Sequence, residues 1–509
     1  MNIRNISLFI AAALLASSCQ KFLDVKPKGK LIPGSVSDFD HLLDNPGTAE
    51  SNFLDHNKSS LLSYMGDNLE MTEGQAKVGF VLNSHPNIER YYGYIFRAPY
   101  KDPNNQDPFW SSGSLGIYTQ ISYFNNLIEG IRGIKDLSQE DEAAARRSVA
   151  QALVARAWCY FNANLIYGPV YKPGTANTAK TIPYVTNPDI NNPLPNLSTS
   201  EEVMTRVLKE LHEALPDLPV RATWQSRASK ATGHAMLAYF HLFTRKYDSV
   251  VHYSNLAWNA GAAGNPGNVL YDYNKFTLGD PKLNIIRRPI NAKEDAFLNQ
   301  VNSREILFYR YADKDAGVGT SLSYPSAELI ALYDKTNDLR AEYFYINSPG
   351  YKTTLSGGFD DGMRISNYRW SKTKVTDGFS WPEVLLMRAE GYARMNQPGL
   401  AIADLNTLRH YRMKTGTPDL VAGTAEDALI EVLNERRREL PIGGLKRFMD
   451  LKRFTLESGK PWSKATITHT LAGVSHTATI DSKDFVIPIS NVVLKFNPGW
   501  GIPMENRPF

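Results

Sequence analysis

Two helix–turn–helix segments of this chain can be aligned with each other at one constant offset along the sequence. Each runs as two amphipathic stretches joined by a short turn, over residues 229–259 and 381–411. Apolar residues recur with helical spacing in all four stretches. The aligned positions are Ala238 with Ala389, His241 with Tyr392, Val250 with Ala401, and Ala257 with Leu408. This pattern predicts paired helices that pack side by side, and hence a mainly α-helical protein.

Small residues at points of close approach, with larger ones between them, resemble tetratricopeptide repeats. Contiguous copies of that repeat recur about every 34 residues, and these two segments lie much further apart. The sequence therefore predicts an interrupted helix-pair scaffold with minor β structure rather than a plain solenoid. Two unrelated helical hairpins remain an alternative.

Three further stretches have helical periodicity and clear boundaries. Gly168 and Pro169 end the first of them. Ser198 or Ser200, followed by Glu201 and Glu202, predicts a capping box at the start of the second. The three stretches are 143–167, 200–215 and 425–440.

Two long irregular tracts, 45–114 and 260–326, separate the helical parts and are rich in Tyr, Asn, Asp, Gly and Pro. Loops of this length in a folded domain are rarely without function, and ligand contacts usually lie on loops held by a rigid frame. A sugar ring stacks its C–H face on an aromatic ring while polar side chains take its hydroxyls. We therefore expect Asp67 and Arg364 as hydrogen-bonding partners, and five tyrosines as stacking platforms: Tyr92, Tyr94, Tyr100, Tyr311 and Tyr324. Trp110 and Trp158 are expected to be buried at helix starts.

The first residues have the features of an export signal. Arg4 precedes an apolar run from Ile6 to Ala16, which is shorter than the roughly 20 residues that a membrane span needs. Small residues then lead directly into Cys19, as in bacterial lipoprotein signals. We expect residues 1–18 to be a signal peptide and Cys19 to become an acylated N-terminus, which would tether the protein to a membrane by its lipid. An ordinary secretory signal is the alternative.

Charge and cysteine content exclude some classes of protein. Lys and Arg total 56 against 52 Asp and Glu, so the net charge of +4 gives no reason to expect nucleic acid as a partner. The basic run Arg436 to Arg438 is interrupted by acids nearby and is expected to be a solvated or ion-paired helix face. Two cysteines, Cys19 and Cys159, exclude a disulfide framework. Cys159 lies in an apolar helix and is expected to be an inert core residue.

Catalytic and metal-binding motifs are largely missing from the sequence. It has no HExxH, GxSxG or P-loop pattern. The tetrapeptide 371–374 spells SxxK and the tripeptide 414–416 spells KTG, but the SDN element that accompanies them is missing. Asp313, Asp315 and Gly317 have the spacing that begins a calcium loop, without the closing Glu. We expect no cofactor, with a structural calcium ion as a weak alternative, and no enzyme activity.

Six stretches, in order along the chain, resemble the SusD/RagB family of outer-membrane nutrient-binding lipoproteins. The resemblance begins with KFLDVKPKGKLIP after Cys19, and continues through IYTQISYFNNLIEGI and ALVARAWCYFNANLIYGPVY. The later stretches are VLLMRAEGYARMNQPGLAIADLNTLRHYR, LNERRRELPIGGLKRFMDLKRF and DFVIPISNVVLKFNPGWGIP. Each stretch alone is weakly specific, and six in the family's order are highly specific.

The resemblance implies one SusD-like domain over residues 19–509, with a tetratricopeptide-like helical scaffold, irregular insertions near 45–114 and 260–326, and a loop-rich ligand-binding face. It also implies a non-catalytic lipoprotein, anchored in the outer membrane and facing the cell exterior. Such a protein captures an oligosaccharide and delivers it to a SusC-like TonB-dependent transporter.

Three other functions remain open at this stage. The same scaffold could bind peptides, which a pocket lined by more charged than aromatic residues would favour. A surface glycoside hydrolase would need two carboxylates about 5–10 Å apart in a cleft. A pure interaction scaffold would show a closed front face without a groove.

Overall fold

The structure is a computed structural model that describes residues 33–49, 60–79, 88–104, 110, 116–189, 191–275, 277–278, 286–287, 303–313, 324–367, 375–441 and 445–507. Its α-helices are α2 (Val36–Asp40), α3 (Ser60–Met65), α4 (Ile88–Tyr94), α5 (Ile117–Arg132), α6 (Gln139–Tyr167), α7 (Ser200–Ala214), α8 (Lys230–Thr244), α9 (Tyr247–Ala262), α10 (Ala327–Ala331), α11 (Leu339–Tyr343), α12 (Trp381–Arg394), α13 (Pro398–Arg409), α14 (Ala425–Glu439), α15 (Lys446–Phe454) and α16 (Asn491–Phe496).

The strands are short and pair antiparallel, two to a sheet, throughout the described residues. They are β1 (Leu69–Glu70), β2 (Lys180–Pro183), β3 (Leu197–Thr199), β4 (Thr277–Leu278), β5 (Ile286–Arg287), β6 (Ile306–Phe308), β7 (Tyr311–Asp313), β8 (Tyr324–Pro325), β9 (Tyr345–Pro349), β10 (Lys352–Thr353), β11 (Phe359–Asp360), β12 (Met363–Asn367), β13 (Val375–Thr376), β14 (Phe379–Ser380), β15 (Thr466–Leu471) and β16 (Val474–Thr479). The prediction of a mainly helical protein with minor β structure is confirmed.

The predicted helix pairs exist and stack on each other. α8 packs on α9 and α12 packs on α13, as the sequence alignment implied, and α9 also packs directly on α12. α9 and α12 are therefore neighbours in one helical stack although they lie far apart in sequence, which explains why the repeats are interrupted. At Gly391 of α12, a Cβ atom would lie 2.7 Å from a methyl carbon of Val251, so a larger residue would push α9 and α12 apart.

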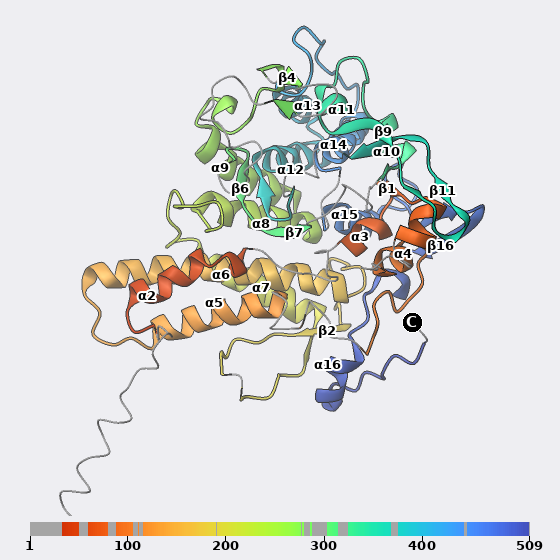
Figure 1. Ribbon diagram of the computed structural model, residues 1–509. Coiled ribbons are helices and arrows are strands. Elements are labelled where there is room, and N and C mark those ends of the chain that lie inside the picture. The colour runs from red at the N-terminus through yellow and green to blue at the C-terminus, as the bar shows by residue number, and fades with distance from the viewer. Residues whose placement is uncertain are drawn as a thin grey trace, which may run out of the picture.

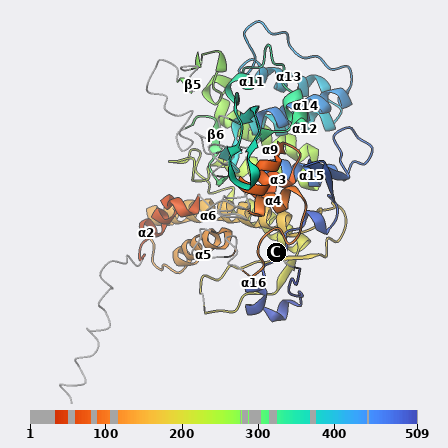
Figure 2. The same ribbon diagram turned by 45° about the vertical axis from the view of Figure 1, so that its right-hand side comes forward.

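A second helical layer lies beneath this stack. α6 packs between α5 and α7, and both views show the long α6 beside α5 and α2 (Figures 1 and 2). α6 begins at Gln139 rather than at the predicted Ala143, because the Ser138 side chain accepts a hydrogen bond from the Asp141 backbone and caps the first turn. For α7 the capping residue is Thr199, whose side chain pairs reciprocally with Glu202, rather than either predicted serine.

The basic run at the end of α14 is buried, so the prediction of a solvated face is wrong, while the ion-paired alternative is confirmed. Arg436 pairs with Glu383 of α12 and with Asp450 of α15 at 3.0 and 2.7 Å, and Asp450 also pairs with Arg453. Each charge in this chain of contacts has an opposite charge beside it, which is the condition under which ionised groups can stay in a protein interior. The ion pairs thereby hold α12, α14 and α15 together.

The two irregular tracts meet in a short ladder. β1, from the first tract, pairs with β8, from the end of the second, so that Glu70 lies opposite Tyr324 and Leu69 opposite Pro325. The hairpin β15–β16 approaches the same region; its two-residue turn, Ala472 and Gly473, has positive φ at both positions, as tight antiparallel hairpins favour. Segments that are remote in sequence therefore meet at one edge of the molecule, where Figure 1 shows β1, α10, β11 and β16 together.

Candidate functional site

A pocket of about 460 Å³ opens at this edge, and we call it the β1 pocket. Its wall comes from the β1 region, α4, the start of α10, β12 and the β15–β16 hairpin. The lining residues are Asp67, Leu69, Glu70, Met71, Thr72, Glu73, Tyr94, Ser326, Glu328, Arg364, Thr468, His469, Thr470 and Ala472. Both irregular tracts thus contribute to one cavity, whose volume is within the range that small-molecule sites occupy.

Arg364 lines the β1 pocket and contacts both Glu70 and Tyr324. Its guanidinium forms an ion pair with Glu70 and lies over the ring of Tyr324, 4.7 Å from the ring centroid. The Tyr324 hydroxyl donates a hydrogen bond to Asp361 at 2.8 Å and accepts one from the Tyr351 backbone at 2.6 Å. Because the Tyr324 ring is fully buried, it orients Arg364 rather than offering a face to solvent.

Asp67 also lines the pocket and is held by three cations. Arg447 donates two hydrogen bonds to its carboxylate, at 2.6 and 2.7 Å, and Lys464 donates another at 2.6 Å. Arg437 lies 3.6 Å from the same group. Burial by itself would raise the pKa of Asp67, but these positive charges outweigh burial and hold the pKa well below 3.8. Asp67 is therefore ionised at neutral pH and occupied by protein partners.

Tyr94 and His469 form a stacked pair in the wall. Their ring centroids are 4.2 Å apart and nearly parallel, and Phe96 stacks on the other face of His469 at 4.8 Å. The two imidazole nitrogens lie 2.7 and 2.8 Å from the backbone oxygens of Tyr94 and Gly66. Burial lowers the pKa of His469. The stack fixes the β15–β16 hairpin against α4, which positions the threonines of β15 along the pocket.

The charges that line the pocket are paired with each other or with neighbours. Glu70 pairs with Arg364 and Glu73 with Lys77. Glu328 pairs with Arg437 and Lys464, the cations that also surround Asp67. Every carboxylate of the lining thus has a cationic partner, so the wall is rich in hydrogen-bonding groups but has little excess charge.

Of the seven residues predicted as ligand contacts, Asp67, Tyr94 and Arg364 line the β1 pocket, and Tyr324 lies directly beneath it. Tyr92 and Tyr100 do not line it. Tyr100 is fully buried and donates a hydrogen bond to the Asp484 backbone oxygen at 2.6 Å.

The ring of Tyr92 is 5% exposed and lies under the Arg97 guanidinium. Tyr311 begins β7, and its side chain lies outside the described residues. The expectation of exposed tyrosine platforms is thus not met at Tyr92, Tyr94, Tyr100 or Tyr324, since all four are buried.

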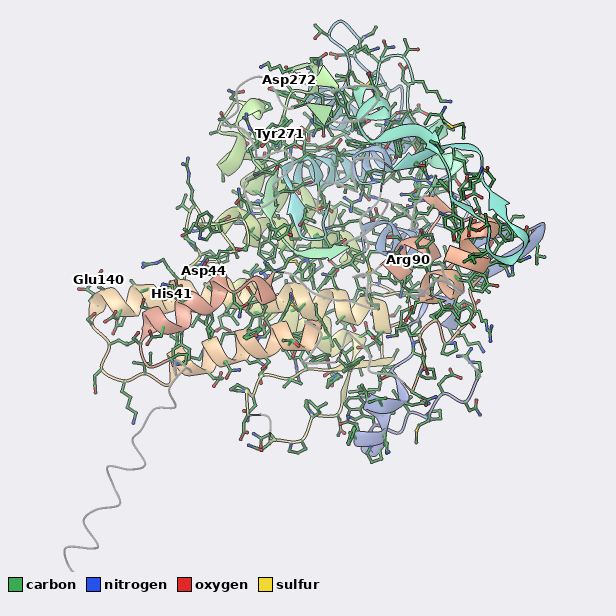
Figure 3. All side chains as sticks on the ribbon, in the orientation of Figure 1. His41, Asp44, Arg90, Glu140, Tyr271 and Asp272 are labelled. Atoms are coloured by element: carbon green, nitrogen blue, oxygen red, sulfur yellow. The ribbon has the colours of Figure 1, made fainter. Side chains whose placement is uncertain are left out.

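Other tyrosines of the second tract are also structural. Figure 3 shows Tyr271 and Asp272 near the top of the molecule, well separated from Arg90 of α4. Tyr271 and Tyr273 are both buried, and the Tyr271 hydroxyl accepts a hydrogen bond from the Arg304 backbone at 3.2 Å. Of the tryptophans, Trp158 is fully buried as expected, whereas Trp110 is only half-buried and stacks on Tyr118.

Most of the polar wall was not predicted from the sequence. Thr72, Glu73, Glu328, Thr468 and Thr470 carry no motif, and Glu328 comes from a different part of the chain than Thr468. The one usable signal was the alternation in TITHTL, whose buried positions alternate with exposed ones along β15. That alternation predicts a strand but not which cavity its exposed side faces.

Three other predictions concern reactive or metal-binding groups. Cys159 is buried and free, and burial raises the pKa of its thiol to about 12, as expected for an inert core residue. The described residues contain no cluster of His, Cys, Asp and Glu that could hold a metal ion. The side chains of the calcium-like segment at 313–317 and the SxxK segment at 371–374 lie outside the described residues, as does Cys19. Among the residues that the structure describes, no helix combines the length and hydropathy of a membrane span.

Two family models match the sequence and together span most of the chain. Residues 21–242 match the model described as starch-binding associating with outer membrane, and residues 378–499 match the SusD family model. The chain belongs to the SusD/RagB family. No curated protein matches the sequence of this chain.

Solved structures of the SusD superfamily have the same fold. A SusD superfamily protein from Bacteroides vulgatus is 17% identical, with a TM-score of 0.67 over 92% of this chain and 98% of that one. A SusD-like carbohydrate binding protein from the same organism is 17% identical, with a TM-score of 0.61 over 92% and 97% of the two chains. A SusD-like carbohydrate binding protein from Bacteroides fragilis is 16% identical, with a TM-score of 0.60 over 92% and 99%.

Membership in the SusD/RagB family confirms the predicted fold and the predicted class of protein. The family consists of non-catalytic, carbohydrate-binding proteins associated with the outer membrane. This contradicts the glycoside hydrolase alternative. The open β1 pocket differs from the closed face that a pure interaction scaffold would show.

Proposed function

We propose that this SusD-like protein captures a neutral oligosaccharide in the β1 pocket and delivers it to a SusC-like TonB-dependent transporter. Asp67, Tyr94, Arg364 and, through Arg364, Tyr324 would form or support this site. Tyr92, Tyr100 and Tyr311 remain outside the proposal, because the first two are buried elsewhere and the side chain of the third is not described.

The observation that carries the proposal is that the first irregular tract, the end of the second, β12 and the β15–β16 hairpin line one polar cavity. A carboxylate, a guanidinium and threonine hydroxyls lie within its wall, and these are the groups that hydrogen-bond sugar hydroxyls. The pairing of the lining charges favours an uncharged ligand, since an ionic ligand would have to break ion pairs that already exist. The carboxylates and the guanidinium of the lining are each held by a neighbour, so the charged part of the wall is ordered before the ligand arrives.

We expect the Arg364→Ala variant to bind oligosaccharide at least tenfold more weakly than the native protein. The variant removes a hydrogen-bond donor from the wall and leaves Glu70 without its cationic partner. Isothermal titration with a panel of neutral oligosaccharides (malto-, cello- and mannohexaose) measures the change. Lys352→Ala is the matched control, because Lys352 is exposed, pairs only with Asp360 among the described residues, and does not line the pocket. Unchanged affinity of Arg364→Ala for every sugar that binds would contradict the proposed site.

A peptide ligand is a second candidate, and one observation favours it. Charged side chains outnumber aromatic ones in the lining of the β1 pocket, with Tyr94 as its one tyrosine. The same titration with a panel of tetra- to hexapeptides separates the candidates. Binding of peptides without binding of any sugar would favour this second function.

The location of the protein is part of the proposal. The family's association with the outer membrane and the lipoprotein-like sequence before Cys19 support a lipid anchor at that residue. We expect Cys19→Ala to release the protein from the membrane fraction and to abolish labelling by a palmitate analogue. Digestion of native protein by trypsin on intact cells would show that it faces the exterior, and chemical cross-linking to a TonB-dependent transporter would show the partner. A Cys19→Ala protein that stays membrane-bound and labelled would rule out the anchor.

A further inference from the structure

A second cavity, of about 490 Å³, lies between α5 and the loop residues 184–189 and 192–195, which precede β3 in the chain. We call it the α5 pocket. None of its lining residues is shared with the β1 pocket. Tyr118, Ile121, Ser122 and Asn125 line it from α5, a spacing that places all four on one face of the helix.

The α5 side of this pocket is rigid. The Tyr118 ring stacks on Trp110 with 4.7 Å between centroids, and its hydroxyl donates a hydrogen bond to the Pro183 backbone oxygen at 2.8 Å. Asn125 donates to the Val185 backbone oxygen at 3.0 Å and accepts from Arg156 at 2.7 Å. Arg156 is in turn held by the buried Glu210. The wall is therefore formed before any ligand binds.

The opposite side presents small polar groups. Thr186, Asn187 and Asn192 line the cavity from this loop, and the Thr186 and Asn192 side chains make no hydrogen bond within the described part of the chain. Among the described residues, Asp189 is the one charged side chain in the lining. The α5 side of the wall thus offers Tyr118 and Ile121, and the loop opposite offers three prolines beside the unused hydroxyl and amide groups of Thr186 and Asn192.

Aromatic surface continues beyond the mouth of the pocket. The Trp500 indole donates a hydrogen bond to the Pro195 backbone oxygen at 3.1 Å, and its ring centroid lies 6.2 Å from that of Trp110. Trp110 and Trp500 are both half-buried. Leu194 and Phe496, which are 41% and 79% exposed, lie in the segments that flank this contact.

We propose that the α5 pocket is a second carbohydrate site, which takes one or two units of a neutral hexose chain. A ligand for this wall needs an apolar face for Tyr118, several hydroxyls for Thr186 and Asn192, and no charge. A pyranose ring meets all three conditions. The choice of a sugar rests on the proposed function, while the position of the site rests on the cavity.

The test uses full-length protein labelled with 5-fluorotryptophan and titrated with malto-, cello- and mannohexaose. The Thr186→Ala/Asn192→Ala variant removes the unused polar groups, and Ser122→Phe fills the cavity. Asn126→Ala is the matched control, since Asn126 is an exposed neighbour on α5 that does not line the pocket. We expect the fluorine signals of Trp110 or Trp500 to shift on titration, and both pocket variants to weaken the binding that causes the shift at least tenfold.

The two sites are separated by combining variants. In Arg364→Ala protein, the shift of the tryptophan fluorine signals should persist. Adding Thr186→Ala and Asn192→Ala to this protein should remove the shift. Loss of all binding in Arg364→Ala, with no effect of the α5-pocket variants, would overturn the second site and leave the proposed function standing. Unchanged binding in Arg364→Ala, with loss of binding in the α5-pocket variants, would overturn the β1 pocket as the capture site and support the second site. Absence of any tryptophan shift with every sugar would overturn the second site.

Discussion

Replacement of Arg412 by methionine is expected to lower the free energy of unfolding by about 3–5 kcal/mol, because it removes one partner from a buried network of charges. Arg412 has no exposed surface in its side chain and donates hydrogen bonds to Glu305 and Glu439 at 2.7 and 2.8 Å. Its guanidinium also lies over the Tyr273 ring, 4.1 Å from the centroid. Methionine leaves both carboxylates short of a buried positive charge, and an unpaired buried charge costs far more than a lost surface contact.

Urea denaturation followed by circular dichroism measures this loss. The matched control is Arg132→Met, which breaks the exposed pair between Arg132 and Glu213 and is expected to cost less than about 1 kcal/mol. Adding Glu305→Gln to Arg412→Met should recover part of the stability, since one uncompensated carboxylate disappears. Equal stability losses for Arg412→Met and Arg132→Met would show that the network does not hold the helices together.

The helices of the SusD-like frame were predictable because their signals are local. In α6, α7 and α14, apolar periodicity and capping residues lie within a few positions of each other, and the observed ends differ from the predicted ones by a few residues at most. The buried network was not predictable in the same way. Arg412 meets Glu305, and Arg436 meets Glu383, across long stretches of chain, so the sequence showed the charges without their partners.

The candidate site was predicted only in part, because its contacts also join residues that lie far apart in sequence. The composition of the two irregular tracts pointed to a ligand-binding region, and the β1–β8 ladder does bring them together. Composition could not show which tyrosines face inward, however. The hydroxyls of Tyr100 and Tyr324 donate hydrogen bonds to Asp484 and Asp361, which lie far away in sequence. These contacts hold both rings in the interior of the protein.

Asp67 was chosen from the sequence as a ligand contact, and the structure predicts a second, larger role for it. Within the described residues, Arg447 forms an ion pair with Asp67 alone, while Lys464 and Arg437 pair with both Asp67 and Glu328. Asp67→Asn keeps the shape of the side chain but removes the charge that holds these three cations. We therefore expect it to lower the free energy of unfolding by about 3–5 kcal/mol, together with a loss of binding at the β1 pocket.

The pH dependence distinguishes this anchoring role from a mere ligand contact. The folded protein holds the pKa of Asp67 well below its usual 3.8, so the stabilisation is complete above that value and is lost as the pH falls through the lower folded pKa. The stability difference between native protein and Asp67→Asn, measured by urea denaturation, should therefore be constant from pH 7 to about 5 and shrink below about pH 4. Glu73→Gln breaks the exposed Glu73–Lys77 pair at the same pocket. Its free energy of unfolding should differ little from that of native protein at every pH. If Asp67→Asn instead kept native stability and lost only sugar binding, Asp67 would be a ligand contact and the three cations would be stable without it.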